Sequence, residues 1–297
     1  MILLSEPSVI VEGLNLPECP RWHDGALTFS DIMAGRIYRL GMNDQAEIVH
    51  EEPDDFIGGL GFLANGDLLA VLSKQRKLLR IGPQGATEYA DLTGLCRFVL
   101  NDMAVHAGRA YVSQPGFDIW TNEAHGMPDP TDIILVQPDG ATAIAASDMM
   151  SPNGMAISPD GRTLYVAEST AMRITCFEID PDSGALSNRR LFGALPQGGI
   201  PDGICLDNHG AVWSASPVAY SDGVVRSGLG VIRIAPGGDV THCVPLAKGR
   251  RALACAIGGV NGGTLYICTV PEFEGPAAFS AAAGRLEKVS LADMEIT

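Results

Sequence analysis

The feature that most constrains this fold is a short unit that recurs six times along the chain. Its clearest copy covers residues 151–168, where an apolar run is followed by Pro159-Asp160-Gly161 and a second apolar run, Leu164–Ala167. Proline presets φ and glycine accepts a positive φ, so the segment predicts two strands joined by a tight turn. The turn glycines of the six copies stand at positions 25, 66, 108, 161, 210 and 262.

The spacing of these glycines, 41 to 53 residues, indicates the architecture. Repeats of roughly 40–50 residues built from short strands are typical of propeller blades. We therefore expect an all-β chain in which residues 1–297 form one six-bladed β-propeller around a central channel. Residues 8–14 and 284–289 predict strands near the two ends that pair and close the ring. The second blade is expected to span about residues 44–90.

The first position of each repeat is where we expect the chemistry, because equivalent positions of a propeller surround one end of the channel. These positions hold, in order, Glu18, Gly58, Asn101, Asn153, Asp202 and Ala254. Four carry a side-chain oxygen, and two of those four are carboxylates. Hard oxygen donors suit a divalent cation such as Ca²⁺, Mg²⁺ or Mn²⁺, and two carboxylates balance its charge. The sequence therefore predicts a central metal site.

Each of these residues also has a simpler interpretation as part of a turn. Asn153-Gly154 is a common turn dipeptide, and Pro201-Asp202-Gly203 resembles the hairpin turn Pro159-Asp160-Gly161. The register separates the two cases. Asp202 stands before the first strand of its repeat, whereas Asp160 lies in the hairpin after that strand. The agreement of four equivalent positions favours the ligand interpretation.

Several short motifs, in this order and spacing, carry a resemblance to a known family. They are Glu18-Cys19-Pro20-Arg21-Trp22, Asn101-Asp102, Ser151-Pro152-Asn153-Gly154-Met155-Ala156, Pro201-Asp202-Gly203 and Cys255-Ala256-Ile257-Gly258-Gly259. Together they resemble the regucalcin/gluconolactonase (senescence-marker-protein-like) family of six-bladed propeller metallohydrolases, which open lactones. The resemblance spans nearly the whole chain.

The resemblance implies roles for particular residues. Glu18, Asn153 and Asp202 would bind one divalent metal ion (Ca²⁺, Mg²⁺, Mn²⁺ or Zn²⁺, with Ca²⁺ favoured). Asp202 would also act as the acid–base group. Asn101 would contact the substrate or a bound water, and Asp102 would orient it from behind. The activity implied is that of a metal-dependent lactonase, a carboxylic-ester hydrolase acting on a small-molecule lactone or ester.

Two positions depart from the family pattern. Cys19 follows the metal-binding glutamate where the family often has glycine. Val99 stands where the members that handle sugar lactones have an arginine before the first asparagine. Val99 offers no hydrogen bond to a sugar hydroxyl, so we expect a substrate less polar than an aldonolactone, with Val99 near it.

Further site residues are expected from a long insert in the third blade, residues 114–130. Loops of this length are usually functional or mobile. Trp120, Asn122 and Glu123 are plausible substrate contacts, with a surface loop around a self-packed tryptophan as the equal alternative. Residues 216–223 predict a second irregular loop. Glu168, at the end of its strand, is a weaker candidate for supporting the site from behind.

Composition narrows the partners and the compartment. The formal net charge of −15 argues against non-specific nucleic-acid binding, which needs basic side chains. The seven cysteines include no Cys-x-x-Cys pair, which favours reduced thiols in the cytoplasm. No apolar run approaches the roughly 18 residues of a membrane span, so no membrane role is expected. The sequence does not indicate an oligomeric state.

Two other functions remain open at this stage. One is a calcium-binding or interaction propeller without catalysis, because fold does not fix function. The other is a propeller enzyme of different chemistry, acting on a natural-product intermediate. No Gly-x-Ser-x-Gly, His-Glu-x-x-His or phosphate-binding glycine motif is present to favour another class of enzyme.

Overall fold

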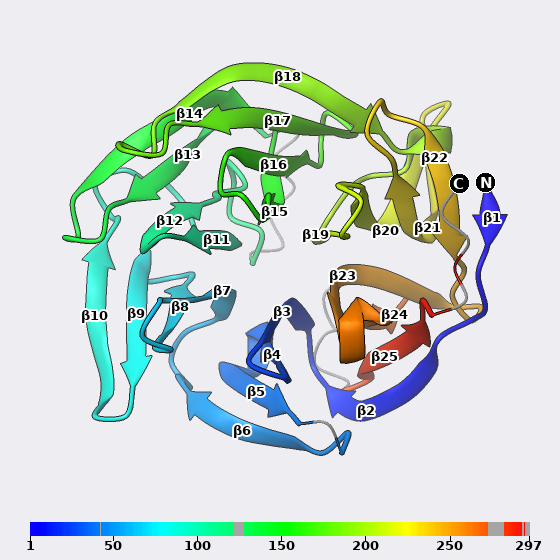
Figure 1. The fold of residues 1–297 in the computed structure, drawn as a ribbon, viewed down its shortest axis with the longest axis horizontal. Helices are drawn as coiled ribbons and strands as arrows, with labels where there is room; N and C mark the ends of the chain where they lie inside the picture. The colour runs from blue at the N-terminus through cyan, green and yellow to red at the C-terminus, as the bar shows by residue number, and fades with distance from the viewer. Residues whose placement is uncertain (42, 121–127, 273–281, 293, 295–297) are drawn as a thin grey trace.

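The computed structural model is a ring of six β-sheets arranged around a central channel (Figure 1). It describes residues 1–41, 43–120, 128–272, 282–292 and 294. The expected all-β, six-bladed propeller is confirmed. Each sheet begins at the channel with its innermost strand, and the chain then runs outward through antiparallel neighbours.

The strands of each blade follow one another in the sequence. From the channel outward they are β3 (Pro17–His23), β4 (Ala26–Asp31), β5 (Arg36–Leu40) and β6 (Ala46–Glu51) in blade one; β7 (Ile57–Phe62), β8 (Leu68–Leu72), β9 (Lys77–Gly82) and β10 (Gly85–Asp91) in blade two; β11 (Met103–His106), β12 (Arg109–Val112), β13 (Thr131–Val136) and β14 (Thr142–Met149) in blade three; and β15 (Pro152–Ile157), β16 (Thr163–Glu168), β17 (Arg173–Ile179) and β18 (Leu186–Ala194) in blade four.

The last two blades also receive strands from the N-terminal segment. Blade five contains β19 (Ile204–Leu206), β20 (Val212–Ser221), β21 (Val224–Ile234) and β22 (Val240–Val244), with β1 (Ile2–Leu3) at its outer edge; blade six contains β23 (Arg250–Gly258), β24 (Thr264–Pro271) and β25 (Gly284–Ser290), with β2 (Ser8–Leu14) outermost. The described residues also include short 3-10 helices over Ile32–Ala34, Pro196–Gly198 and Val260–Gly262. None of their helices is long and apolar enough to cross a membrane.

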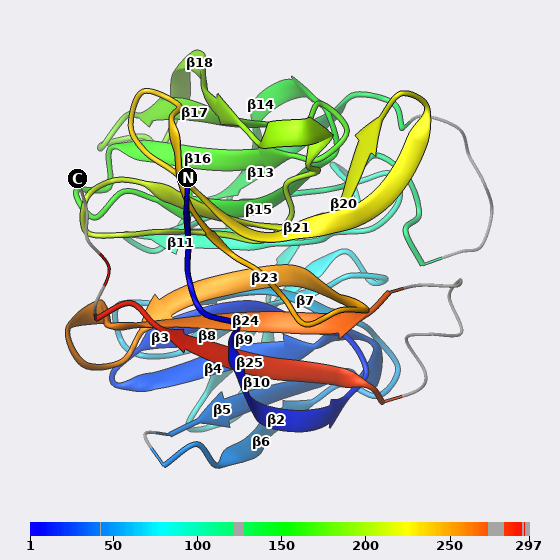
Figure 2. The same ribbon diagram turned by 90° about the vertical axis from the view of Figure 1, so that its right-hand side faces the viewer.

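The ring closes by pairing of the two ends, as expected. β2 runs antiparallel to β25, with Ser8 opposite Lys288 and Leu14 opposite Gly284. Leu14 is buried in the cluster shared by blades one and six. The closure therefore combines backbone pairing with apolar packing, and Figures 1 and 2 show β2 lying beside β25.

The hairpin turns follow the chemistry of their glycines. Gly161 has φ 71° and Gly210 has φ 75°, a region that residues with a Cβ enter only at a cost. The other four turn glycines of the repeat also have positive φ. The sequence period of the repeat is thus the period of the turn that joins the first two strands of each blade.

The apolar core lies between the blades. Within the described residues, one buried cluster fills the space between each pair of neighbouring blades. The middle strands therefore face apolar neighbours on both sides, and every residue of β4 and β8 is buried. The outer strand β10 is mostly exposed.

Two expected boundaries were wrong. The second blade does not begin near residue 44, because β6 pairs with β5 and belongs to blade one. Residues 216–223 do not form an irregular loop, since β20 continues to Ser221 and pairs with β21. Pro217 interrupts the alternating pattern, and the pairing register shifts between Ser216 and Val218. Figure 2 shows the resulting long hairpin.

Candidate active site

A cavity of about 430 Å³ lies at the end of the channel where the innermost strands begin. Glu18 and Asn153 are the second residues of β3 and β15, and Asn101 and Asp202 each stand two residues before β11 and β19. All four residues line the cavity. The structure therefore brings together the four oxygen-bearing positions that the repeat identifies.

Backbone pairing fixes the two residues that stand outside strands. The Asn101 N–H donates to the Ser113 carbonyl at 2.9 Å, and the Asp202 N–H donates to the Ala215 carbonyl at 3.0 Å. Gly58, the equivalent position in blade two, does not line the cavity. A Cβ there would lie 2.3 Å from the Asn101 carbonyl oxygen, so glycine lets the Asn101 backbone come close.

Glu18 is held by an unusual backbone conformation. Cys19 has φ 50°, and the pairing of β3 with β4 shifts register between Glu18 and Arg21. The Cys19 N–H donates to Glu18 Oε2 at 2.9 Å. Glycine adopts this φ without strain, whereas a residue with a Cβ pays about 1–3 kcal/mol. Strain of this kind is typical of functional sites.

A hydrogen-bonded chain links the amides to a carboxylate. Asn101 Nδ2 donates to Asn153 Oδ1 at 2.9 Å, and Asn153 in turn hydrogen-bonds Asp202. Asn101 is therefore oriented by Asn153. Asp102, expected to orient Asn101, instead accepts from Arg21 Nη2 at 2.6 Å and from the Met103 N–H at 2.7 Å.

We call the part of the cavity formed by Glu18, Asn101, Asn153 and Asp202 its floor. The two carboxylates of the floor, Glu18 and Asp202, are unfavourable as a pair of negative charges without a cation. Burial raises the pKa of Glu18 well above its usual range, and the negative charge of Asp202 raises it further. Burial also raises the pKa of Asp202, with a second contribution from the charge of Asp102, while the hydrogen bond from Asn153 opposes the shift. Crowded, desolvated carboxylates favour a bound cation or a retained proton.

The donor set fits a hard divalent cation. Glu18, Asn153 and Asp202 offer oxygen donors only, which suits Ca²⁺, Mg²⁺ or Mn²⁺. Among the described parts of the chain, no three His, Cys, Asp or Glu side chains form a metal-holding group. Any cation at this floor would therefore depend on an amide as well as on the two carboxylates.

The walls of the cavity differ from its floor. Leu16, Ile32, Phe117, Ile119, Trp120 and Leu253 contribute apolar surface. Trp120 both lines the cavity and packs inward, since its Nε1–H donates to Ser73 Oγ at 2.9 Å and its ring contacts Phe56 edge-on at 5.0 Å. The inward packing of this tryptophan is therefore confirmed, and its contact with a substrate stays a prediction.

Two other expected residues, Val99 and Glu168, do not line the cavity. Val99 is buried and is not one of the cavity-lining residues. Asn122 and Glu123 lie outside the described residues. Glu168 is fully buried in blade four, where it accepts from the Met150 N–H at 2.8 Å and from Arg173 Nε at 2.9 Å. It supports the segment that leads to Asn153 and does not line the cavity.

Sequence reasoning missed four polar residues that line the cavity: Ser151, Ser169, Thr170 and Arg251. Ser151 directly precedes the Pro152-Asn153 motif and has φ 50°, which a close reading of that motif could have suggested. Arg251 lies on β23 outside the first position of its repeat. Burial lowers its pKa, while the charge of Glu272 opposes that shift.

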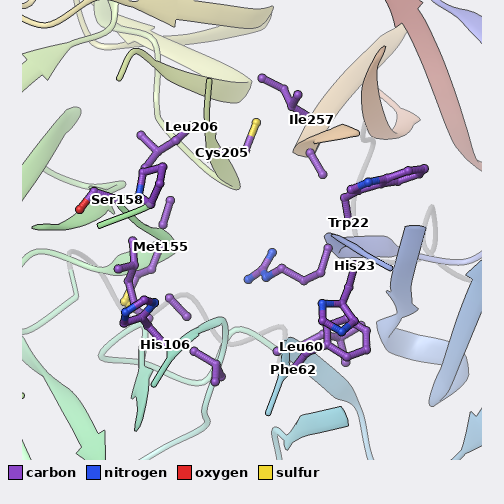
Figure 3. A pocket seen from close by; sticks show the side chains of 18 of the residues that line it. Trp22, His23, Leu60, Phe62, His106, Met155, Ser158, Cys205, Leu206 and Ile257 are labelled. Carbon is purple, nitrogen blue, oxygen red and sulfur yellow. The ribbon is translucent and has the colours of Figure 1, made fainter. Parts of the chain in front are cut away.

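A second cavity, of about 550 Å³, opens at the opposite end of the channel, where the innermost strands end. We call it the far-mouth cavity. Trp22, His23, Phe62, His106 and Cys205 are among its lining residues (Figure 3). Arg21 also lines it, and the ion pair between Arg21 and Asp102 therefore lies toward this end of the channel.

Comparison with known proteins finds relatives that align with most of this chain. The chain is 28% identical to a 6-deoxy-6-sulfogluconolactonase from Pseudomonas putida, over 91% of this chain and 86% of that protein. It is 27% identical to a regucalcin from Danio rerio, over 87% of this chain and 84% of that protein.

Solved structures share the fold. A calcium-binding regucalcin from Agrobacterium tumefaciens has a TM-score of 0.75 at 18% identity, covering 97% of this chain and 95% of its own. A gluconolactonase from Xanthomonas campestris has a TM-score of 0.72 at 23% identity, covering 95% and 88%. The family model described as "SMP-30/Gluconolactonase/LRE-like region" matches residues 16–271. The chain therefore belongs to the SMP-30/gluconolactonase/LRE-like family.

Proposed function

We propose that this chain hydrolyses a lactone with the help of one divalent cation held by Glu18, Asn153 and Asp202. The observation that carries the proposal is the convergence of these residues with Asn101 on the floor of one cavity. Relatives named as lactonases, including one named pentonolactonase, support the reaction class. The donor chemistry supports the cation, with Ca²⁺ favoured.

The chain's own residues would handle the water and the proton. A bound cation would supply Lewis-acid activation of the ester carbonyl and of water. Asp202 would take a proton from the attacking water and return one to the leaving alkoxide. The Asn101 amide donates to Asn153, so its carbonyl oxygen remains to accept from a substrate hydroxyl or from the water. Asn153, which is hydrogen-bonded to Asn101 and to Asp202, would hold both side chains in position.

The cavity walls support a substrate less polar than an aldonolactone. Phe117, Ile119 and Trp120 would pack against an apolar substituent of the ring. Arg251 and Thr170 supply polar groups, which suit an oxygen-bearing end of the same molecule. Val99, which is buried and not lining, would act only through the backbone that leads to Asn101.

We also propose that this protein acts in a reducing compartment. All seven cysteines are free thiols, and all except Cys205 are buried, which supports a reducing compartment such as the cytoplasm. The charge of −15 supports a small-molecule partner over nucleic acid.

The test is hydrolysis of matched lactones by chelated protein before and after addition of Ca²⁺, Mg²⁺, Mn²⁺ or Zn²⁺. The panel pairs aldonolactones with alkyl-substituted lactones of the same ring size. Asp202→Asn should abolish the metal-dependent turnover, whereas Asp160→Asn, the same change in an exposed hairpin turn, should leave it intact. Stoichiometric cation binding without turnover on any lactone would favour a binding propeller instead.

A further inference from the structure

Two cysteines from different blades meet beside the far-mouth cavity. Cys205 lies on β19 and Cys255 on β23, and their Sγ atoms are 3.6 Å apart. Cys255 is buried, and its Sγ lies 3.5 Å from the Trp213 carbonyl oxygen. Cys205 is partly exposed and lines the cavity, where Figure 3 shows its sulfur.

The backbones that carry these thiols are already held together. The Gly203 N–H donates to the Leu253 carbonyl at 2.8 Å, two residues before each cysteine. A Cβ on Gly203 would meet the Ala254 side chain at 2.4 Å, so the two strands are as close as glycine permits. A disulfide needs the sulfur atoms about 2 Å apart, and side-chain rotation can supply most of the remaining approach.

From this geometry we propose that Cys205 and Cys255 form a peroxide-reactive dithiol that links blades five and six. Cys205 Sγ attacks one peroxide oxygen and the O–O bond breaks. The products are a sulfenic acid on Cys205 and one water molecule. Cys255 Sγ then attacks that sulfur, the S–O bond breaks, and a second water leaves. Two thiols are oxidised by two electrons, their protons enter the two waters, and hydrogen peroxide is the oxidant reduced.

The surroundings assign different roles to the two thiols. Cys205 is partly exposed and lines the far-mouth cavity, so peroxide can approach it, whereas Cys255 is buried and does not line that cavity. Burial raises the pKa of Cys205, and the hydrogen bond and charge of Cys255 and the charge of Asp207 add to this, with the Ile257 N–H opposing. The reactive thiolate is therefore scarce at neutral pH, and the pair responds slowly.

A Cys205–Cys255 disulfide would affect the proposed active site through β19 and β23, the strands that carry the two cysteines. Cys205 stands three residues after Asp202, and β23 also carries Arg251 and Leu253, which line the active-site cavity. A bridge here closes a loop of 50 residues. Such a closure should raise the melting temperature of a chain this size by roughly 5 °C. The dithiol proposal does not rest on the proposed lactone hydrolysis.

The experiment exposes the purified full-length protein to graded hydrogen peroxide, alkylates the remaining thiols and maps the peptides by mass spectrometry. We expect loss of two of the seven thiols, with one cross-link between Cys205 and Cys255, reversed by dithiothreitol. In Cys255→Ser, dimedone should trap a sulfenic acid on Cys205. Cys176→Ser, a buried cysteine of blade four, is the matched control and should keep the cross-link.

Two results would overturn the proposal. One is thiol loss in the wild type without a Cys205–Cys255 peptide, at any peroxide concentration. The other is a dithiothreitol-reversible loss of two thiols in Cys205→Ser that equals the loss in the wild type. The wild-type map decides the question even if a variant fails to fold.

Discussion

Neutralising Asp202 should stabilise the protein without metal and remove its response to metal. Asp202 is a desolvated carboxylate that faces the charges of Glu18 and Asp102. Asp202→Asn keeps the shape and the hydrogen bond from Asn153 while removing one of these charges. In chelator, relief of the repulsion and desolvation should contribute on the order of 1–3 kcal/mol to the free energy of unfolding.

The cation response can be sized in the same way. A cation present at 100 times its Kd stabilises the folded state by about 2.7 kcal/mol. An unfolding entropy of about 0.6 kcal/mol/K for 297 residues converts this into a melting-temperature rise of about 4 °C.

Differential scanning calorimetry with chelator and with excess Ca²⁺ is the assay. Wild type and Asp160→Asn should both rise by about 4 °C, whereas Asp202→Asn should begin higher and stay unchanged. The reasoning is refuted if Asp202→Asn melts below wild type in chelator, or if both gain equally from Ca²⁺.

Three further perturbations test the fold around the site. Glu168→Gln should cost about 2 kcal/mol at neutral pH, because the neutral side chain loses charge-assisted hydrogen bonds from Arg173 and Arg189, whose own side chains are 38% and 33% exposed. Burial opposes the shift, but the hydrogen bonds outweigh it and lower the pKa of Glu168. The stabilisation by Glu168 is therefore present above its unfolded pKa of about 4.3 and is lost as pH falls through the folded pKa, so the variant's urea midpoint should vary less with acid pH than that of wild type. Gly58→Ala should lower stability by about 1–3 kcal/mol and displace Asn101, measured by chemical denaturation and loss of turnover, whereas Gly94→Ala, which has open space around it, should do neither. Removing residues 2–14 should abolish cooperative thermal unfolding, because it deletes the strand that closes the ring. Removing residues 2–3 alone, which are exposed, should shift the midpoint little. A sharp transition that survives the longer deletion would contradict the role of this strand in closing the ring.

The ring of innermost strands could be predicted because its signal is periodic. Each blade repeats a turn glycine with positive φ, and four equivalent positions carry oxygen donors at one end of the channel. The outer strands gave a weaker signal. β6 and β10 are mostly exposed, so their side chains do not alternate strictly between apolar and polar, and the boundary of the second blade was misplaced as a result.

The parts of the cavity that could not be predicted come from outside the repeat positions. Arg251 and Thr170 approach the cavity only because the blades curve around the channel, and no local pattern in the sequence records that curvature. Pro217 and the polar residues after it suggested a loop, but a register shift lets β20 continue past the proline. Cys19 shows the reverse case. Its φ of 50° is one that glycine adopts without strain, which gives a physical reason for the glycine that the family resemblance implies at that position.

The most direct test of the central claim is an anomalous difference map from a crystal of this protein soaked in Mn²⁺. The account predicts one peak within about 2.0–2.6 Å of oxygen atoms from Glu18, Asn153 and Asp202, at the floor of the cavity that Asn101 also lines. A peak elsewhere on the protein, or none at this floor in crystals soaked to saturation, would contradict it.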